Sequence, residues 1–184
     1  SMATSTDTER WHPTLWSLWA KSGEDGAWLS VPQHMIDSAE IAGLLWDGWM
    51  PQGVKRLLTD ETGLNASELR ALVTWLAGGH DLGKIDSQFI GQIDGREEHR
   101  WLVDKARTAG LTFPQRAEPG RIPHSHISEA LVSTFLQERT TLAPHETRAF
   151  SAVAGAHHGL PVHQTGRDAA RAHVAWLPAP WQTL

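Results

Sequence analysis

The sequence contains no cysteine, no apolar run long enough to span a bilayer and no excess of basic residues. Without cysteine the chain cannot form disulfides or thiolate metal sites, so histidine and carboxylates remain as metal ligands. The net charge of −5 argues against a broad basic surface that would hold nucleic acid. The N-terminus also lacks a basic and apolar signal peptide. These absences predict a soluble, cytoplasmic protein without a membrane partner.

The length of 184 residues allows one compact domain with a core of its own. Residues 1–10 are polar, and we expect them to form a flexible N-terminus in which Ser1-Met2 is a cloning scar. Residues 11–184 are then the domain. The sequence has no internal repeat and no low-complexity tract.

Apolar residues recur at helical spacing in several segments, and no segment alternates convincingly with period two. The fold class is therefore predicted to be all-α. A long loop is expected over 110–123, where glycine and proline interrupt a polar stretch. Trp16 and Trp19 are interpreted as packing residues rather than a platform for stacking bases. The helices are predicted over residues 34–49, 67–77 with Ser67 as N-cap, 81–92, 101–109, 127–136 and 144–156.

Two adjacent pairs, His80-Asp81 and His157-His158, are the most informative motifs. Each pair follows an apolar helical run, so each is expected at a helix end. With His34 and His124 they supply the ligand set of a divalent-metal site. Imidazole binds such a metal through one nitrogen, and a carboxylate can bridge two metals through its two oxygens.

Asp81 is the natural bridging residue in this set. Neighbouring helical residues point about 100° apart, so His80 and Asp81 reach one metal pair only if the helix opens there. A break at Gly78-Gly79 is expected to give that freedom. Gly159 and Pro161 would release His157 and His158 in the same way.

Each of these residues also has a simpler interpretation. His34 could be a helix residue that faces solvent, and His124 a capping residue whose neighbour His126 is the ligand. Lys84 could be a solvated helix charge, or its ammonium could contact a phosphate or a carboxylate near the metals.

The order of these residues resembles the HD superfamily of metal-dependent phosphohydrolases. More narrowly, residues 18–22 ahead of 34–39, and Gly83-Lys84 leading to Phe89, are similar to the HD nuclease domain of the type I CRISPR-associated helicase-nuclease. In that domain the short segment after the lysine ends in Phe-Gln, whereas in this chain Phe89 is followed by Ile90. The resemblance covers about residues 16–161 and implies an HD-domain helical bundle with its metal site between helix ends.

The resemblance also implies roles for the matching positions. His34, His80 and Asp81 would bind a first metal, and Asp81, His124, His157 and His158 a second. His124 is preferred to His126 because the family pattern has a small polar residue four positions after the ligand, here Ser128. Asp81 and Lys84 are the predicted catalytic residues. His-rich ligation favours Mn, Fe, Co or Ni over Mg, with two ions in a complete site.

Two departures from the family pattern stand out. The family completes its first metal site with an aspartate well downstream of the His-His pair, whereas the last acidic residue here, Asp168, follows too closely. No P-loop of a helicase occurs either. We therefore expect residues 11–184 to be an HD nuclease domain without its C-terminal part and without the helicase. The Trp- and Pro-rich segment 176–181 should pack on this core or on a missing segment.

The resemblance implies a hydrolase that cuts single-stranded DNA, as an endonuclease or exonuclease, during CRISPR interference in antiviral defence. Its partners would be a helicase module that feeds the strand and a guide-RNA surveillance complex that opens the target. Two alternatives stay open. One is an HD phosphohydrolase that acts on small or cyclic nucleotides, and the other is an inactive docking module.

Overall fold

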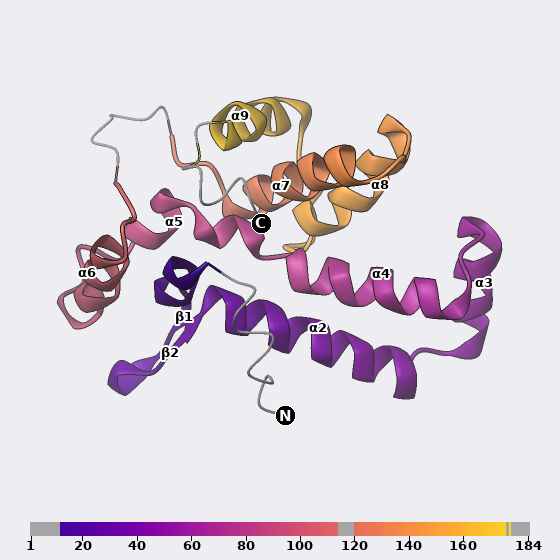
Figure 1. The fold of residues 1–184 in the computed structure, drawn as a ribbon, viewed down its shortest axis with the longest axis horizontal. Helices are drawn as coiled ribbons and strands as arrows, with labels where there is room; N and C mark the ends of the chain where they lie inside the picture. Colours follow the sequence, from indigo (N-terminus) through magenta and orange to yellow (C-terminus); the bar gives the residue numbers. More distant parts are fainter. Residues whose placement is uncertain (1–11, 114–119, 176, 178–184) are drawn as a thin grey trace.

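A computed structural model describes residues 12–113, 120–175 and 177 of the chain. The predicted all-α fold class is confirmed, with one small two-stranded sheet added to the helices (Figure 1). None of the described helices is both long enough and apolar enough to cross a membrane. Residues 1–10 and most of the Trp- and Pro-rich segment lie outside the described residues.

The elements, in chain order, are η1 Pro13–Ser17, β1 Trp19–Ser22, η2 Glu24–Gly26, β2 Trp28–Ser30, α2 Val31–Gly48, α3 Gln52–Thr62, α4 Ala66–Gly79, η3 Leu82–Ile85, α5 Ser87–Gly91, η4 Glu97–His99, α6 Arg100–Thr108, α7 His124–Arg139, α8 Pro144–Gly155 and α9 Gln164–Val174.

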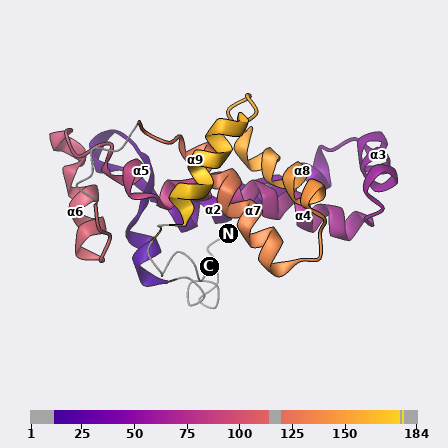
Figure 2. The same cartoon turned by 90° about the horizontal axis from the view of Figure 1, so that it is seen from above.

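The helices form two packed pairs, α2 with α4 and α7 with α8, and α9 packs on the second pair. The long helices α2 and α4 lie side by side, joined at one end by α3, and α7 pairs with α8 above α4 (Figure 1). Helix α9 lies across α7, as the view from above shows (Figure 2). The short helix η3 continues from α4 and packs against α7. The end of α4 therefore lies at the centre of the bundle.

Several helix boundaries differ from the predicted ones because of capping. Helix α2 begins at Val31, since the Ser30 hydroxyl accepts a hydrogen bond from the Gln33 backbone N–H. Asn65, and not Ser67, caps α4, and it forms a capping box with Glu68. The helix expected over 81–92 is broken at Asp86, whose extended backbone separates η3 from α5.

Several elements were not predicted from the sequence: the helices α3 and α9, the hairpin β1–β2 and the short helices η1, η2 and η4. Helices α3 and α9 are polar on average, and Ala170 is their only buried residue, so they contain few of the apolar positions by which a helix is recognised. The strands have four and three residues, too few for alternation to be recognised. The described residues of the expected loop, 110–113 and 120–123, contain neither helix nor strand.

The main apolar core lies between the hairpin, α5 and α6. Trp19 is buried there, as predicted for a packing residue, and its indole N–H donates to the Ile90 carbonyl over 3.0 Å. Its ring packs on Phe89 with a centroid distance of 4.6 Å. Phe89 in turn contacts the His124 ring at 5.2 Å. The core thus extends to the floor of the histidine cluster.

Candidate metal centre

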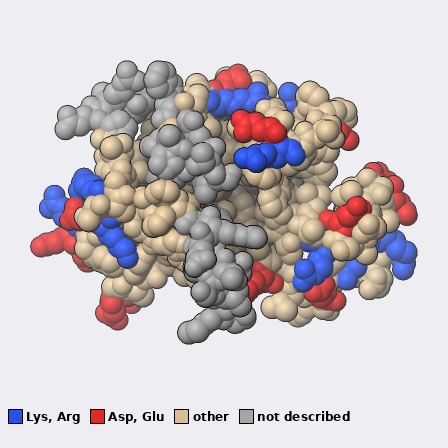
Figure 3. All heavy atoms as spheres, in the orientation of Figure 1, with Lys and Arg blue, Asp and Glu red and all other residues tan. Residues whose placement is uncertain are grey.

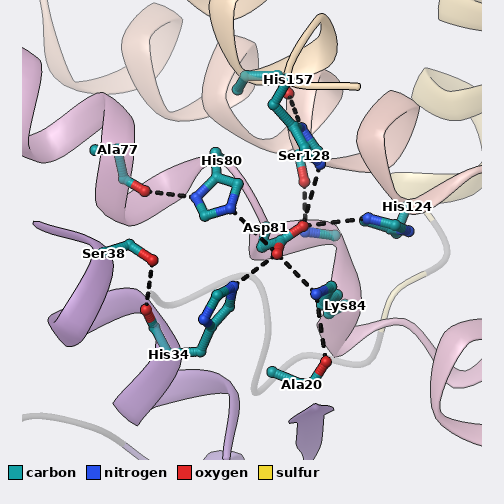
Figure 4. A network of polar contacts seen from close by, with 12 residues as sticks. Ala20, His34, Ser38, Ala77, His80, Asp81, Lys84, His124, Ser128 and His157 are labelled. Carbon is teal, nitrogen blue, oxygen red and sulfur yellow. Dashed lines mark hydrogen bonds and ion pairs between the residues drawn. The ribbon is translucent and has the colours of Figure 1, made fainter. Parts of the chain in front are cut away.

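The carboxylate of Asp81 lies at the centre of a cluster of histidines that come from separate helices (Figure 4). The side chain of Asp81 is only 4% exposed. The structure brings all six predicted ligands to this place, in two groups of possible metal ligands: His34, His80 and Asp81, and His124, His157 and His158.

Each histidine is placed by a helix end. His34 lies in the first turn of α2, and its carbonyl accepts the Ser38 hydroxyl. His80 is the C-cap of α4, and His124 is the first residue of α7. His157 and His158 follow the end of α8 at Gly155. The predicted position of both pairs at helix ends is therefore correct.

The expected helix break at Gly78-Gly79 is wrong. Helix α4 runs through both glycines, and the backbone leaves the helical region only at Asp81, where φ is −106° and ψ is 16°. A Cβ on Gly78 would lie 3.4 Å from the Met35 carbonyl oxygen and from the Ala39 Cβ on α2. The glycine therefore serves the close packing of α2 on α4.

Gly83 has a packing role that was not predicted from the sequence. A Cβ at this position would overlap the His124 carbonyl oxygen and come within 2.8 Å of the Ser128 backbone nitrogen. The Gly83 N–H donates to the Ser128 hydroxyl over 2.8 Å. Glycine therefore allows the first turn of α7, with His124, to approach Asp81. The sequence feature that could have indicated this role is the position of Gly83 between the predicted site residues Asp81 and Lys84.

One oxygen of Asp81, Oδ2, faces the first group. It lies 2.7 Å from His34 Nε2 and 3.2 Å from His80 Nε2. Lys84 Nζ is also 2.7 Å from this oxygen and donates to the Ala20 carbonyl over 3.3 Å. Because its side chain is only 6% exposed, Lys84 is not a solvated surface charge. Of the two contacts predicted for its ammonium, with a phosphate or with a carboxylate, the structure shows the contact with the carboxylate of Asp81.

The other oxygen, Oδ1, faces the second group. His124 Nε2 and His157 Nε2 each lie 3.2 Å from it. His158 Nε2 is 3.1 Å from His124 Nε2 and is the most exposed member of the cluster. The two oxygens of one carboxylate thus divide the histidines between them, which is the arrangement that a bridging ligand requires.

Backbone carbonyls orient two of the imidazoles. His80 Nδ1 lies 2.6 Å from the Ala77 carbonyl oxygen, and His157 Nδ1 lies 2.6 Å from that of Ala154. A carbonyl only accepts, so Nδ1 carries the hydrogen in both rings and the neutral ring presents an Nε2 lone pair to Asp81. Metal-binding histidines are commonly held in this way by their second nitrogen.

Two facing acceptors in the cluster are left without a partner. Asp81 Oδ1 and His157 Nε2 are buried and make no hydrogen bond within the described part of the chain, although they are 3.2 Å apart. Two such acceptors face each other favourably only when a proton or a cation lies between them. The residues therefore fit a divalent cation, and nitrogen and carboxylate donors suit a transition metal.

The cluster also shifts the pKa of its members. Burial alone would raise the pKa of Asp81, but its contacts with the surrounding imidazoles, led by His124 and His157, hold it well below its usual range. The contact with Asp81 raises the pKa of His80. Burial lowers the pKa of Lys84 and of His158, and the neighbouring histidines lower that of His158 further. Asp81 is therefore a permanent anion at the centre.

Two residues weighed in the sequence analysis lie elsewhere. The ring of His126 is directed at α9, where it is within 3 Å of the position that a Gly166 Cβ would take. Geometry thus favours His124, whose Nε2 reaches Asp81. Asp168 lies on the exposed side of α9 and accepts from the Gln164 amide over 2.9 Å. It belongs to neither ligand group among the described residues.

The surface around the molecule carries both signs of charge. On the face drawn in Figure 3, Lys and Arg side chains alternate with Asp and Glu side chains, and neither sign forms a broad continuous area among the described residues. This face therefore offers no broad basic area for a phosphate backbone.

Comparison with known proteins gives concordant matches. A family model described as the HD domain of Cas3 matches residues 19–184. The chain is 28% identical over 157 residues to the CRISPR-associated nuclease/helicase Cas3 of Streptococcus thermophilus. The matched region covers 79% of this chain and 16% of that protein. A crystal structure described as a CRISPR-associated protein matches 98% of this chain and 19% of its own, with a TM-score of 0.78 and 24% identity. The chain therefore spans less than a fifth of the length of these relatives.

Proposed function

Because this chain belongs to the family of Cas3 HD domains, we propose that it is a metal-dependent nuclease that cuts single-stranded DNA during type I CRISPR interference. The observation that carries the proposal is the divided carboxylate of Asp81, with His34 and His80 at one oxygen and His124 and His157 at the other. This arrangement offers two adjacent places for cations around one shared anion.

The proposed ligands follow from this geometry. His34, His80 and Asp81 would hold one ion, and Asp81, His124, His157 and His158 the other. Divalent ions bound there supply Lewis acidity toward a phosphodiester and a water of lowered pKa. The mixed nitrogen and oxygen donors favour Mn, Fe, Co or Ni over Mg.

The protein itself contributes orientation. The carbonyls of Ala77 and Ala154 fix His80 and His157 with Nε2 toward the centre. Lys84 holds Asp81 Oδ2 and ties the carboxylate to β1 through the Ala20 carbonyl. We therefore assign Lys84 to the positioning of Asp81, since its buried ammonium is already engaged by that carboxylate.

The charge of the chain supports a partner that delivers the strand. A chain with a net charge of −5 and interspersed surface charges offers little electrostatic attraction to a phosphate backbone. A helicase module would deliver the single strand, and a guide-RNA surveillance complex would open the target duplex. The Streptococcus relative carries both nuclease and helicase in its name.

The proposal is tested by incubating labelled single-stranded DNA with the protein and Mn²⁺, Fe²⁺, Co²⁺, Ni²⁺ or Mg²⁺ in turn. Cleavage with a transition metal should be lost in Asp81→Ala and retained in Asp168→Ala, which removes an exposed carboxylate outside the cluster. Duplex DNA should resist cleavage, because nothing in the reaction separates its strands.

Three results would contradict the proposal. Hydrolysis of free or cyclic nucleotides without cleavage of DNA would favour a small-molecule phosphohydrolase. Metal binding without hydrolysis of any substrate would favour an inactive docking module. Equal cleavage by wild type and Asp81→Ala would remove the cluster from the reaction.

A further inference from the structure

Glu129 is a charged residue in the interior whose position the proposed chemistry does not explain. It lies on α7 and is only 4% exposed. Glutamate is rarely buried unless it is paired, because an isolated carboxylate loses its hydration in the interior. The partners of Glu129 therefore indicate what the residue does.

One oxygen of Glu129 is paired with α9. Oε1 accepts from Arg167 Nε, and the Arg167 side chain is itself 20% exposed. Arg167 lies in the first turn of α9, where its backbone N–H donates to the His163 carbonyl over 3.0 Å. The contact thus fixes the point at which the chain enters α9.

The other oxygen of Glu129 packs on the end of α8. Oε2 occupies the space that a side chain on Gly155 would need, and the Glu129 Cβ is 3.0 Å from that position. Gly155 is the last residue of α8 and is followed by the turn that carries His157 and His158. Glu129 therefore touches the chain directly before this turn.

Between these two points lies the segment 156–163, which we call the histidine loop. Val162 anchors its far end, since it is 4% exposed and packs between Gly155 and Gly166. Glu129 thus contacts the residue before the histidine loop and pairs with the helix after it. Helix α7, which carries Glu129, also presents His124 at its N-terminus.

We propose that Glu129 is a positioning residue that sets the histidine loop, and with it His157 and His158, against His124. This inference rests on the proposed function, because it assumes that these histidines bind a metal. Glu129 contacts Gly155 at one end of the loop and Arg167 beyond the other, so the three imidazoles of the second group share one rigid reference in α7.

The test uses Co²⁺ alone as the probe, with binding followed by calorimetry and by the visible absorption of the bound ion. Glu129→Gln and Arg167→Gln should each weaken binding about tenfold, the lower end of the effect of changing groups that orient metal ligands. The absorption spectrum should change as well, because the loop histidines shift around the ion.

Two further variants separate positioning from a general loss of stability. Leu102→Ala removes a buried side chain of α6, in a core cluster that includes no residue of the histidine loop, and should lower the melting temperature while the Co²⁺ spectrum stays that of wild type. The double variant Glu129→Gln, Arg167→Gln replaces the ion pair by two neutral amides and leaves no unpaired charge. It should therefore bind Co²⁺ more tightly than either single variant.

The outcomes distinguish this inference from the proposed function. If wild type binds Co²⁺ in a manner that His157→Ala abolishes, while Glu129→Gln binds it with unchanged affinity and spectrum, the positioning role is wrong and the metal centre stands. Equal loss of Co²⁺ binding in Leu102→Ala and Glu129→Gln would also overturn the positioning role. If His157→Ala binds Co²⁺ as wild type does, the metal centre itself is wrong.

Discussion

At the scale of single residues, His80 and His157 are held in the same way. Each directs Nδ1 at a backbone carbonyl three residues earlier, at 2.6 Å, and turns Nε2 toward a different oxygen of Asp81. The carbonyl at the end of a helix has no intrahelical partner, so it is free to accept this bond. A histidine one or two residues beyond a helix end therefore has its tautomer, as well as its ring position, set by the last turn of the helix.

The two sides of the centre should also differ in their titration. Contact with Asp81 raises the pKa of His80 above its ordinary 6.5, because the anion favours the imidazolium. Burial, and then the neighbouring histidines, lower the pKa of His158 below that value. We expect His80 to be protonated first as the pH falls, so metal bound on its side should be released at the higher pH.

Two-dimensional NMR of the histidine rings in the metal-free protein measures this order directly. His99 provides a comparison, since it lies on η4 outside the cluster. The assignment of the two sides would be contradicted if His158 titrated at a higher pH than His80.

At the scale of elements, the contact between η3 and α7 brings the two ligand groups together. η3 follows Asp81, and α7 begins with His124, so their separation sets the distance between the two residues. Gly83 and the buried Ser128 form this contact through the bond from backbone to hydroxyl. A side chain on Gly83 would meet backbone atoms of α7, which cannot rotate away.

Gly83→Ala should therefore displace α7, lower the free energy of unfolding by about 1–3 kcal/mol, as overpacking does, and abolish metal binding on the His124 side. Chemical denaturation and Co²⁺ titration measure the two effects.

Gly79→Ala, in α4, is the matched control, because its Cβ would make an ordinary contact 3.6 Å from the Val132 side chain on α7. Alanine is favoured over glycine in helices by up to about 1 kcal/mol, so this variant should be neutral or stabilising. Equal effects of the two substitutions would show that Gly83 has no special packing role.

At the scale of the whole molecule, the candidate ligands come from positions between 34 and 158 and meet only in the folded chain. A metal that binds this cluster binds the folded state alone and stabilises it by mass action. The stabilisation is about 2.7 kcal/mol when free metal is at 100 times its dissociation constant.

Removal of metal by a chelator should therefore lower the melting temperature by roughly 5 to 10 °C for a domain of this size. Differential scanning calorimetry with and without added Mn²⁺ or Co²⁺ measures the shift. The shift should disappear in His157→Ala, which deletes one ligand. A chelator effect that is unchanged in this variant would place the metal elsewhere.

Much of this protein could be predicted from local pattern alone. Apolar residues at helical spacing predicted the all-α class and the helices that are rich in apolar residues. Helices α3 and α9 are polar on average and the strands are short, so these elements were missed. The motif His80-Asp81, read with His34, His124 and the His157-His158 pair, was sufficient to identify the family.

By itself, the sequence determined which residue types were available and at which helix ends they lie, since capping and periodicity are local. The tertiary structure alone decided which oxygen of Asp81 each histidine faces, that His124 and not His126 enters the cluster, and that Lys84 is engaged by Asp81. It also decided that Glu129 spans the ends of the histidine loop. These relations join residues far apart in the chain, and they depend on how closely helices pack, which no local pattern records.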